Sequence, residues 1–92
     1  MNEVDILQIF YDSMVARSVT RDQVFLSIDK NFVVLLNKKL KSQVSIKQVL
    51  KLTDICIANE WLERTTADPG YNFLSLTEAG LQIVLSREYG GV

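Results

Sequence analysis

The chain of 92 residues has no histidine, a single cysteine and a single proline. Without histidine it lacks the commonest general base and the commonest metal ligand of proteins, and one cysteine leaves no disulfide within the chain. No pair of titratable residues has the spacing typical of a carboxylate or lysine enzyme. We therefore expect a protein that is not an enzyme and that binds neither a metal ion nor a cofactor.

Long hydrophobic runs are also missing. No apolar segment approaches the roughly 18 residues that a membrane-spanning helix needs, and the N-terminus lacks the basic and hydrophobic regions of a signal peptide. Hydrophobic residues make up 48% of the sequence and charged residues 23%, which is typical of a globular protein. We expect one cytoplasmic domain formed by residues 1–92, with no membrane association and a loose tail at residues 89–92.

The chain has no excess of basic charge overall, since the net charge is −1 and the isoelectric point is about 5.3. Such a balance argues against a protein that coats nucleic acid through its overall charge. The basic residues are nevertheless concentrated, because half of the ten lie within residues 38–51, a segment without aspartate or glutamate. They are Lys38, Lys39, Lys41, Lys47 and Lys51.

A first helix is expected to begin near Glu3 and to end near Arg17. Asn2 is a preferred N-cap residue, and the acidic Glu3 suits the positive end of the helix dipole. Apolar residues recur at helical spacing along this segment and predict one buried stripe. They are Ile6, Leu7, Phe10 and Met14.

A capping box formed by Thr20 and Gln23 predicts that a second helix begins there. Apolar residues then follow a period of about 3.6 residues as far as Lys41. This segment suits one long helix or two short helices broken near residues 29–31. The β-branched residues at positions 32–36 would also suit a short strand, but a helix is the favoured interpretation.

The third predicted helix, residues 45–60, has the most regular pattern in the chain. Ser45 and Gln48 form a second capping box at its start. One side of its helical projection is expected to be buried and carries Ile46, Val49, Leu50, Thr53, Cys56 and Ile57. The other side carries Lys47, Gln48, Lys51 and Asp54.

The pattern then changes to that of a β-hairpin. Two strand-like runs, residues 61–66 and 71–76, have about the length of average strands. Residues 67–70 between them contain a proline and a glycine, which favour a turn. Thr77 is expected to cap a last helix that buries Leu81, Val84 and Leu85.

These elements predict a mainly α protein with a small β-hairpin (α+β), in the order α-α-α-β-β-α of a winged helix-turn-helix domain. Residues 59–64, Asn-Glu-Trp-Leu-Glu-Arg, resemble the segment between recognition helix and wing in bacterial regulators of the multiple-antibiotic-resistance repressor and phenolic-acid repressor types. Residues 76–80, Leu-Thr-Glu-Ala-Gly, resemble the Leu-Thr-x-x-Gly that follows the wing in those proteins. The resemblance covers residues 45–85.

The resemblance implies a homodimeric transcription regulator whose third helix enters the major groove of double-stranded DNA, while its wing touches the adjacent backbone. The chain departs from the antibiotic-resistance type at the wing tip, where those proteins usually carry Asp-x-Arg and residues 68–71 read Asp-Pro-Gly-Tyr. No basic residue lies between Arg64 and Arg87, so DNA contact would fall on the third helix and the lysines before it. The dimer surface stays open between the first helix, the last helix and residues 32–40.

Six residues are candidates for DNA contact. Lys47 and Lys51 lie one turn apart on the exposed face of the third helix and suit phosphate groups, and Gln48 suits a base edge. The lysines at the end of the second helix either add phosphate contacts or simply suit the negative end of the helix dipole. They are Lys38, Lys39 and Lys41.

A winged-helix module that binds another protein and not DNA is the alternative function, because the acidic isoelectric point and the non-basic wing suit it. Leu52 and Ile55 lie off the buried arc of the third helix and either pack on the second helix or mark a partner surface. Tyr71 and Phe73 alternate on the second strand and either pack or stack on single-stranded nucleic acid. Cys56 is expected to be a small buried hydrophobic residue.

Overall fold

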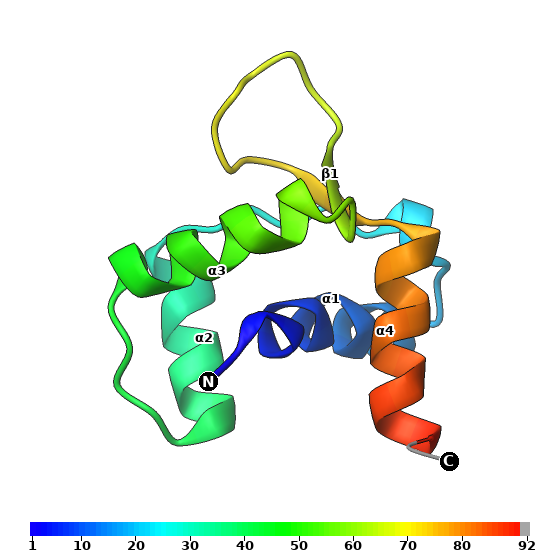
Figure 1. The fold of residues 1–92 in the computed structure, drawn as a ribbon, viewed down its shortest axis with the longest axis horizontal. Helices are drawn as coiled ribbons and strands as arrows, with labels where there is room; N and C mark the ends of the chain where they lie inside the picture. The colour runs from blue at the N-terminus through cyan, green and yellow to red at the C-terminus, as the bar shows by residue number, and fades with distance from the viewer. Residues whose placement is uncertain (91–92) are drawn as a thin grey trace.

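The computed structural model describes residues 1–90, and in these residues it contains four α-helices, one short 3-10 helix and a two-stranded antiparallel sheet. The class is therefore mainly α with a small hairpin, as predicted. Helix α1 crosses the centre of the molecule beneath α3, with α2 and α4 on either side and the hairpin loop above (Figure 1). In chain order the elements are α1 (Glu3–Arg17), η1 (Arg21–Gln23), α2 (Lys30–Leu40), α3 (Ile46–Ala58), β1 (Leu62–Arg64), β2 (Leu74–Leu76) and α4 (Glu78–Tyr89).

Helix α1 begins and ends where the sequence predicts. Asn2 Oδ1 accepts hydrogen bonds from the backbone N–H groups of Val4 and Asp5, at 2.9 and 3.3 Å, and Asp5 Oδ2 accepts from Asn2 N at 3.0 Å. The helix stops at Arg17 because Ser18 adopts a left-handed conformation with φ 54°. Asp5 also pairs with Arg87 Nη1 at 2.7 Å, which joins the start of α1 to the end of α4.

One hydrophobic core contains side chains from all four helices and both strands. Phe10 of α1 and Phe32 of α2 meet in it with their ring centroids 6.1 Å apart. Among residues 1–90, no helix is long and apolar enough to cross a membrane. The buried hydrophobic residues are Ile6, Leu7, Ile9, Phe10, Val24, Ile28, Phe32, Leu36, Val49, Cys56, Leu62, Leu74, Leu76 and Val84.

The prediction that a helix begins at Thr20 is wrong beyond the first turn. Gln23 Oε1 accepts from the Thr20 N–H at 3.1 Å, but only the 3-10 turn η1 follows. The chain then becomes extended, since Leu26 and Leu74 exchange two backbone hydrogen bonds of 3.0 and 2.8 Å. Helix α2 begins at Lys30, so the interpretation of residues 32–36 as helix is confirmed.

The two strands of the hairpin are shorter than predicted. The ladder pairs only Leu62 with Leu76, Glu63 with Ser75 and Arg64 with Leu74. Tyr71 and Phe73 therefore do not alternate on a strand, and Phe73 has a left-handed φ of 53°. This segment bonds to the chain before α2 and not to β1: the Ile28 N–H donates to Tyr71 O at 2.8 Å and the Phe73 N–H donates to Ser27 Oγ at 3.0 Å.

Helix α4 begins at the predicted cap and packs unusually close to the hairpin. Thr77 Oγ1 accepts from the Gly80 N–H at 3.0 Å and donates to Glu60 O at 2.6 Å. A Cβ atom on Gly80 would lie only 2.2 Å from the carbonyl oxygen of Trp61. Tyr89 ends α4 with Gly90 as its C-cap, and residues 91–92 of the predicted tail lie outside the described part.

We predict that Gly80→Ala lowers the free energy of unfolding by about 1–3 kcal/mol, because the added methyl group collides with a fixed backbone carbonyl. Urea denaturation followed by circular dichroism measures this change. Gly70→Ala is the matched control: its Cβ would lie 3.1 Å from a side-chain oxygen of Asp68, so we expect a change within about 0.5 kcal/mol. Equal stabilities of the two variants would contradict the close contact.

Candidate nucleic-acid interface

Helix α3 is held by its first turn and by one buried face. The Ser45 Oγ accepts from the Gln48 N–H at 3.3 Å, and Gln48 Oε1 accepts from the Ser45 N–H at 3.1 Å, so the predicted capping box is confirmed. Its buried residues are Val49, Thr53 and Cys56, and the Thr53 hydroxyl donates to Val49 O at 2.8 Å. The opposite face of the helix is therefore left to solvent.

Cys56 is buried in the core, as predicted. Its Sγ lies 3.3 Å from the carbonyl oxygen of Glu3. Burial, with a smaller contribution from the Glu3 charge, raises the pKa of the Cys56 thiol to about 12. The thiol is thus protonated at neutral pH and packs as a small hydrophobic group.

Three predicted contact residues share the exposed face of the first half of α3. Lys47, Gln48 and Lys51 are all exposed, and within residues 1–90 neither lysine forms an ion pair. Gln48 and Lys51 also line a hollow of about 330 Å³, together with Met1, Val44 and Leu52. The structure therefore brings these three residues together at the N-terminal half of α3.

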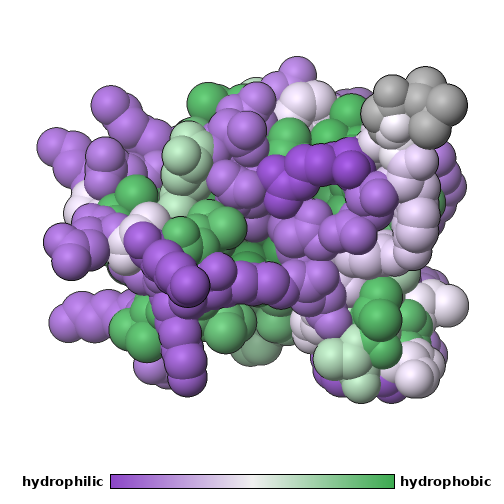
Figure 2. All heavy atoms as spheres, turned by 90° about the horizontal axis from the view of Figure 1, so that it is seen from below, coloured by the Kyte–Doolittle hydropathy of each residue, from purple (hydrophilic) through white to green (hydrophobic). Residues whose placement is uncertain are grey.

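The lysines of α2 form a separate group. Helix α2 ends at the lower edge of the molecule, and the chain climbs from there to the start of α3 (Figure 1). Lys38 and Lys41 are exposed, but Lys39 pairs with the Asp12 carboxylate of α1. Seen from below, long hydrophilic side chains project between smaller hydrophobic areas (Figure 2). The structure thus does not join these lysines to those of α3 in one cluster.

Asn37 organises the turn between α2 and α3, and sequence reasoning missed it. Its Nδ2 donates to Val44 O at 3.0 Å, while its Oδ1 accepts from the Val44 N–H at 3.0 Å and from the Ser42 hydroxyl at 2.9 Å. The turn also contains Lys41 with a left-handed φ of 52°. An asparagine inside an apolar and basic helix was the available signal, since asparagine favours turns over helix interiors.

Arg64, the basic residue at the start of the hairpin loop, forms its hydrogen bonds within the loop. Arg64 Nε donates to the carbonyl oxygens of Pro69 and Gly70, at 3.1 and 3.2 Å. At the tip, hydrogen bonds from the Asn72 side chain and the Gly70 N–H lower the pKa of the Asp68 carboxyl. The tip therefore presents a negative charge, which suits a DNA phosphate poorly.

A hydrogen bond joins the hairpin loop to α3. The Tyr71 hydroxyl donates to Asp54 Oδ1 at 2.8 Å, and this bond raises the pKa of Tyr71. Asp54 lies one turn beyond Lys51, so the acid nearest to the basic half of the helix is bound by the loop. The two residues are far apart in sequence, and no local pattern could have paired them.

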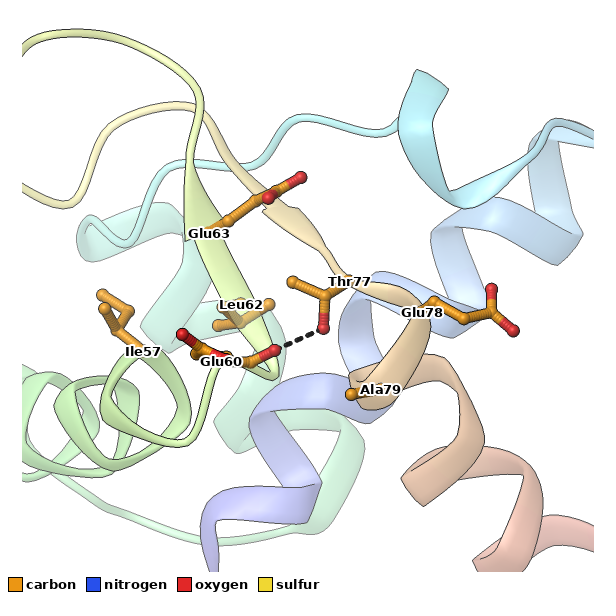
Figure 3. Close-up of a pocket in the computed structure, with 7 residues that line it drawn as sticks. All are labelled: Ile57, Glu60, Leu62, Glu63, Thr77, Glu78 and Ala79. Atoms are coloured by element: carbon orange, nitrogen blue, oxygen red, sulfur yellow. Dashed lines mark hydrogen bonds between the residues drawn. The ribbon is translucent and has the colours of Figure 1, made fainter.

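The C-terminal end of α3 is acidic. Glu60, Glu63 and Glu78 surround a hollow of about 490 Å³ near the base of the hairpin (Figure 3). Their carboxylates point in different directions, and no group of residues within 1–90 is arranged to hold a metal ion. The charge of the α3 region therefore changes sign from its first half to its end.

The apolar residues beside the exposed face of α3 differ in burial. Leu52 is half-buried and packs against the core, whereas Ile55 is 42% exposed. Ile55 therefore exposes more apolar surface on α3 than Leu52 does.

We predict that Asn37→Ala lowers the free energy of unfolding by about 1–3 kcal/mol, because the partly buried polar groups of the turn lose their partner. The Asn31→Ala variant, on the exposed start of the same helix, is expected to change it by less than about 0.5 kcal/mol. Thermal and urea unfolding of both variants measures the difference. An unchanged stability of Asn37→Ala, or an equal loss in both variants, would contradict this role of Asn37, since alanine itself favours the helix more than asparagine does.

Comparison of the chain with protein-family models, with curated proteins and with solved structures found no match.

Proposed function

We propose that the protein is a transcription regulator of the winged-helix type that binds double-stranded DNA as a homodimer, with the N-terminal half of α3 in the major groove. The observation that carries this proposal is the exposed face of α3. Lys47 and Lys51 hold two positive charges one turn apart, with no carboxylate paired to them within residues 1–90. Gln48 lies beside them.

The polarity of α3 supports one orientation on DNA. Its first half is basic and carries the positive end of the helix dipole, whereas its far end is surrounded by Glu60, Glu63 and Glu78. A polyanion is attracted to the first end and repelled by the second. The helix would therefore enter the groove with Ser45 leading.

The backbone arrangement supports the winged-helix interpretation. The bridge between Leu26 and Leu74 places an extended segment before α2 alongside the hairpin. The order becomes helix, extended segment, helix, helix, strand, strand, helix. Together with the resemblance of residues 59–64 and 76–80, this order is consistent with a winged helix whose hairpin is the wing.

The three side chains would have different roles in DNA recognition. Lys47 and Lys51 would neutralise phosphates and release counterions, which supplies affinity without sequence preference. Gln48 uses its Oε1 in the helix cap, which leaves its Nε2 hydrogens for a base edge. The wing adds little attraction, because Arg64 bonds within the loop and Asp68 carries a negative charge at the tip.

We predict that Lys47→Ala and Lys51→Ala each weaken duplex binding, and that each lowers the slope of log Kd against log salt by about 1, because each removes one phosphate contact. Fluorescence anisotropy with a labelled duplex of random sequence, titrated at several salt concentrations, measures both quantities. Arg17→Ala is the matched control, since Arg17 is an exposed basic residue at the end of α1 and does not lie on α3. Absence of duplex binding by the unaltered protein in dilute buffer would refute the proposal.

We further predict that Gln48→Ala changes the preferred sequence and also lowers the free energy of unfolding by about 0.5–1 kcal/mol, because the same side chain caps α3. Selection from a random duplex library measures the preference, and urea unfolding measures the stability. Gln23→Ala removes the equivalent capping oxygen from η1, on another element. That control should lose stability without any change in preference; a shift in both variants would assign the effect to stability alone.

A second candidate is the interaction of the same face with a protein. Two exposed apolar side chains favour it: Ile55 on α3 is 42% exposed and Phe73 in the hairpin loop is 55% exposed. The half-buried Leu52 does not extend this surface. Salt-independent binding to a partner protein, with no affinity for duplex DNA, would favour this candidate over the first.

A further inference from the structure

The extended segment between η1 and α2 leaves one edge of its backbone unpaired. Leu26 directs its N–H and C=O toward Leu74 of β2, and the Ile28 N–H bonds to Tyr71 O on the same side. In an extended chain the intervening residues point the other way. The backbone N–H and C=O groups of Phe25 and Ser27 accordingly form no hydrogen bond within residues 1–90.

An apolar groove lies beside this free edge. Ile9 of α1, Leu26 of the edge and Leu35 of α2 line two adjoining hollows of about 280 and 210 Å³. Leu35 is 51% exposed and Phe25 48%, so large apolar side chains meet solvent on both sides of the edge. An unpaired strand edge with adjacent apolar surface is a ready site for strand addition.

We propose that the edge at residues 24–28 is the homodimer interface, where two copies pair antiparallel about a two-fold axis at Leu26. This inference deepens the proposed function by naming the surface through which the DNA-binding dimer would form.

The register follows from the directions of the backbone groups. With the axis at Leu26, Phe25 of each copy faces Ser27 of the other, and each pair exchanges two hydrogen bonds. The two Leu26 residues form the intervening non-bonded pair, which agrees with their use of N–H and C=O toward β2. Every outward-pointing group at Phe25 and Ser27 then has a partner, and the two Leu26 side chains meet where the grooves adjoin.

Charges at the ends of the segment complement each other in this pairing. Asp22 and Lys30 lie equally far before and after Leu26 in the sequence, and both are exposed. The antiparallel arrangement brings Asp22 of one copy to the same end as Lys30 of the other, and the two-fold axis repeats the contact. A second copy of the chain therefore suits the edge in hydrogen bonding, apolar contact and charge.

Sedimentation equilibrium without DNA tests the interface. We expect the unaltered chain to show a reversible equilibrium between monomer and dimer, and Phe25→Pro to weaken it by about tenfold or more, because it removes the hydrogen-bond donor at position 25 in both copies. Val24 has φ −110° and ψ 120°, a conformation compatible with a following proline. Phe25→Ser keeps the N–H and separates the loss of the side chain from the loss of the bond.

A charge exchange provides a second test that does not alter the backbone. Lys30→Asp should weaken the dimer by about three- to tenfold, and the double variant Asp22→Lys/Lys30→Asp should restore it. A monomeric unaltered chain, a folded Phe25→Pro variant that dimerises as before, or a double variant that stays weak would each overturn the proposed interface.

The same variants distinguish this inference from the proposed function. Lys47→Ala/Lys51→Ala should dimerise normally while losing DNA affinity. If that variant dimerises and no chain binds DNA, the interface stands and the DNA-binding proposal fails.

Discussion

Two backbone hydrogen bonds between Leu26 and Leu74 tie the first third of the chain to the hairpin. They turn a segment with helical periodicity into an extended one, and they set the point at which α2 can begin. Because α2 ends in the turn that leads into α3, the position of α3 depends on this pairing as well. The hairpin thus acts as a structural partner for the helices and not only as an appendage beside them.

The exposed face of α3 is fixed in place by neighbouring residues, and its charge changes sign along the helix. Its first turn is fixed by the cap of Ser45 and by the Asn37 turn, while its middle is joined to the hairpin loop through Asp54 and Tyr71. Ordering a loop or a flexible helix end on binding costs free energy. On this face both the helix end and the loop are already held by hydrogen bonds before binding. The proposed contact with DNA would then depend mainly on charge and on the fit of a preformed helix.

The sequence was sufficient to predict the helix ends that are fixed by residues close to them in the chain. The caps at Asn2, Ser45 and Thr77 were predictable because an acceptor and its N–H donor lie within one turn. The capping box at Thr20 predicted the start of a helical turn correctly but its length wrongly, since the backbone of Leu26 bonds to Leu74 in the folded chain. A capping box specifies how a helix begins and carries no information about where it ends.

The candidate site was predictable to the same degree. The exposed side of α3 follows from its apolar period alone, so Lys47, Gln48 and Lys51 could be grouped in advance. The separation of these residues from the α2 lysines could not be predicted, because it depends on the length of α2 and on the path of the chain from α2 to α3. The pairing of Lys39 with Asp12 likewise requires the packing of two helices.

The double use proposed for Gln48 has a consequence for how the proposed regulator could change its preferred DNA sequence. Its Oε1 completes the cap of α3, so the side chain is constrained by folding as well as by the proposed recognition. A replacement at this position must supply an acceptor of similar reach, and glutamate, the other residue suited to a capping box, would bring a negative charge toward the phosphates. In the proposed complex, altered specificity is therefore easier to reach through Ile55, which projects from the same face without a part in the cap.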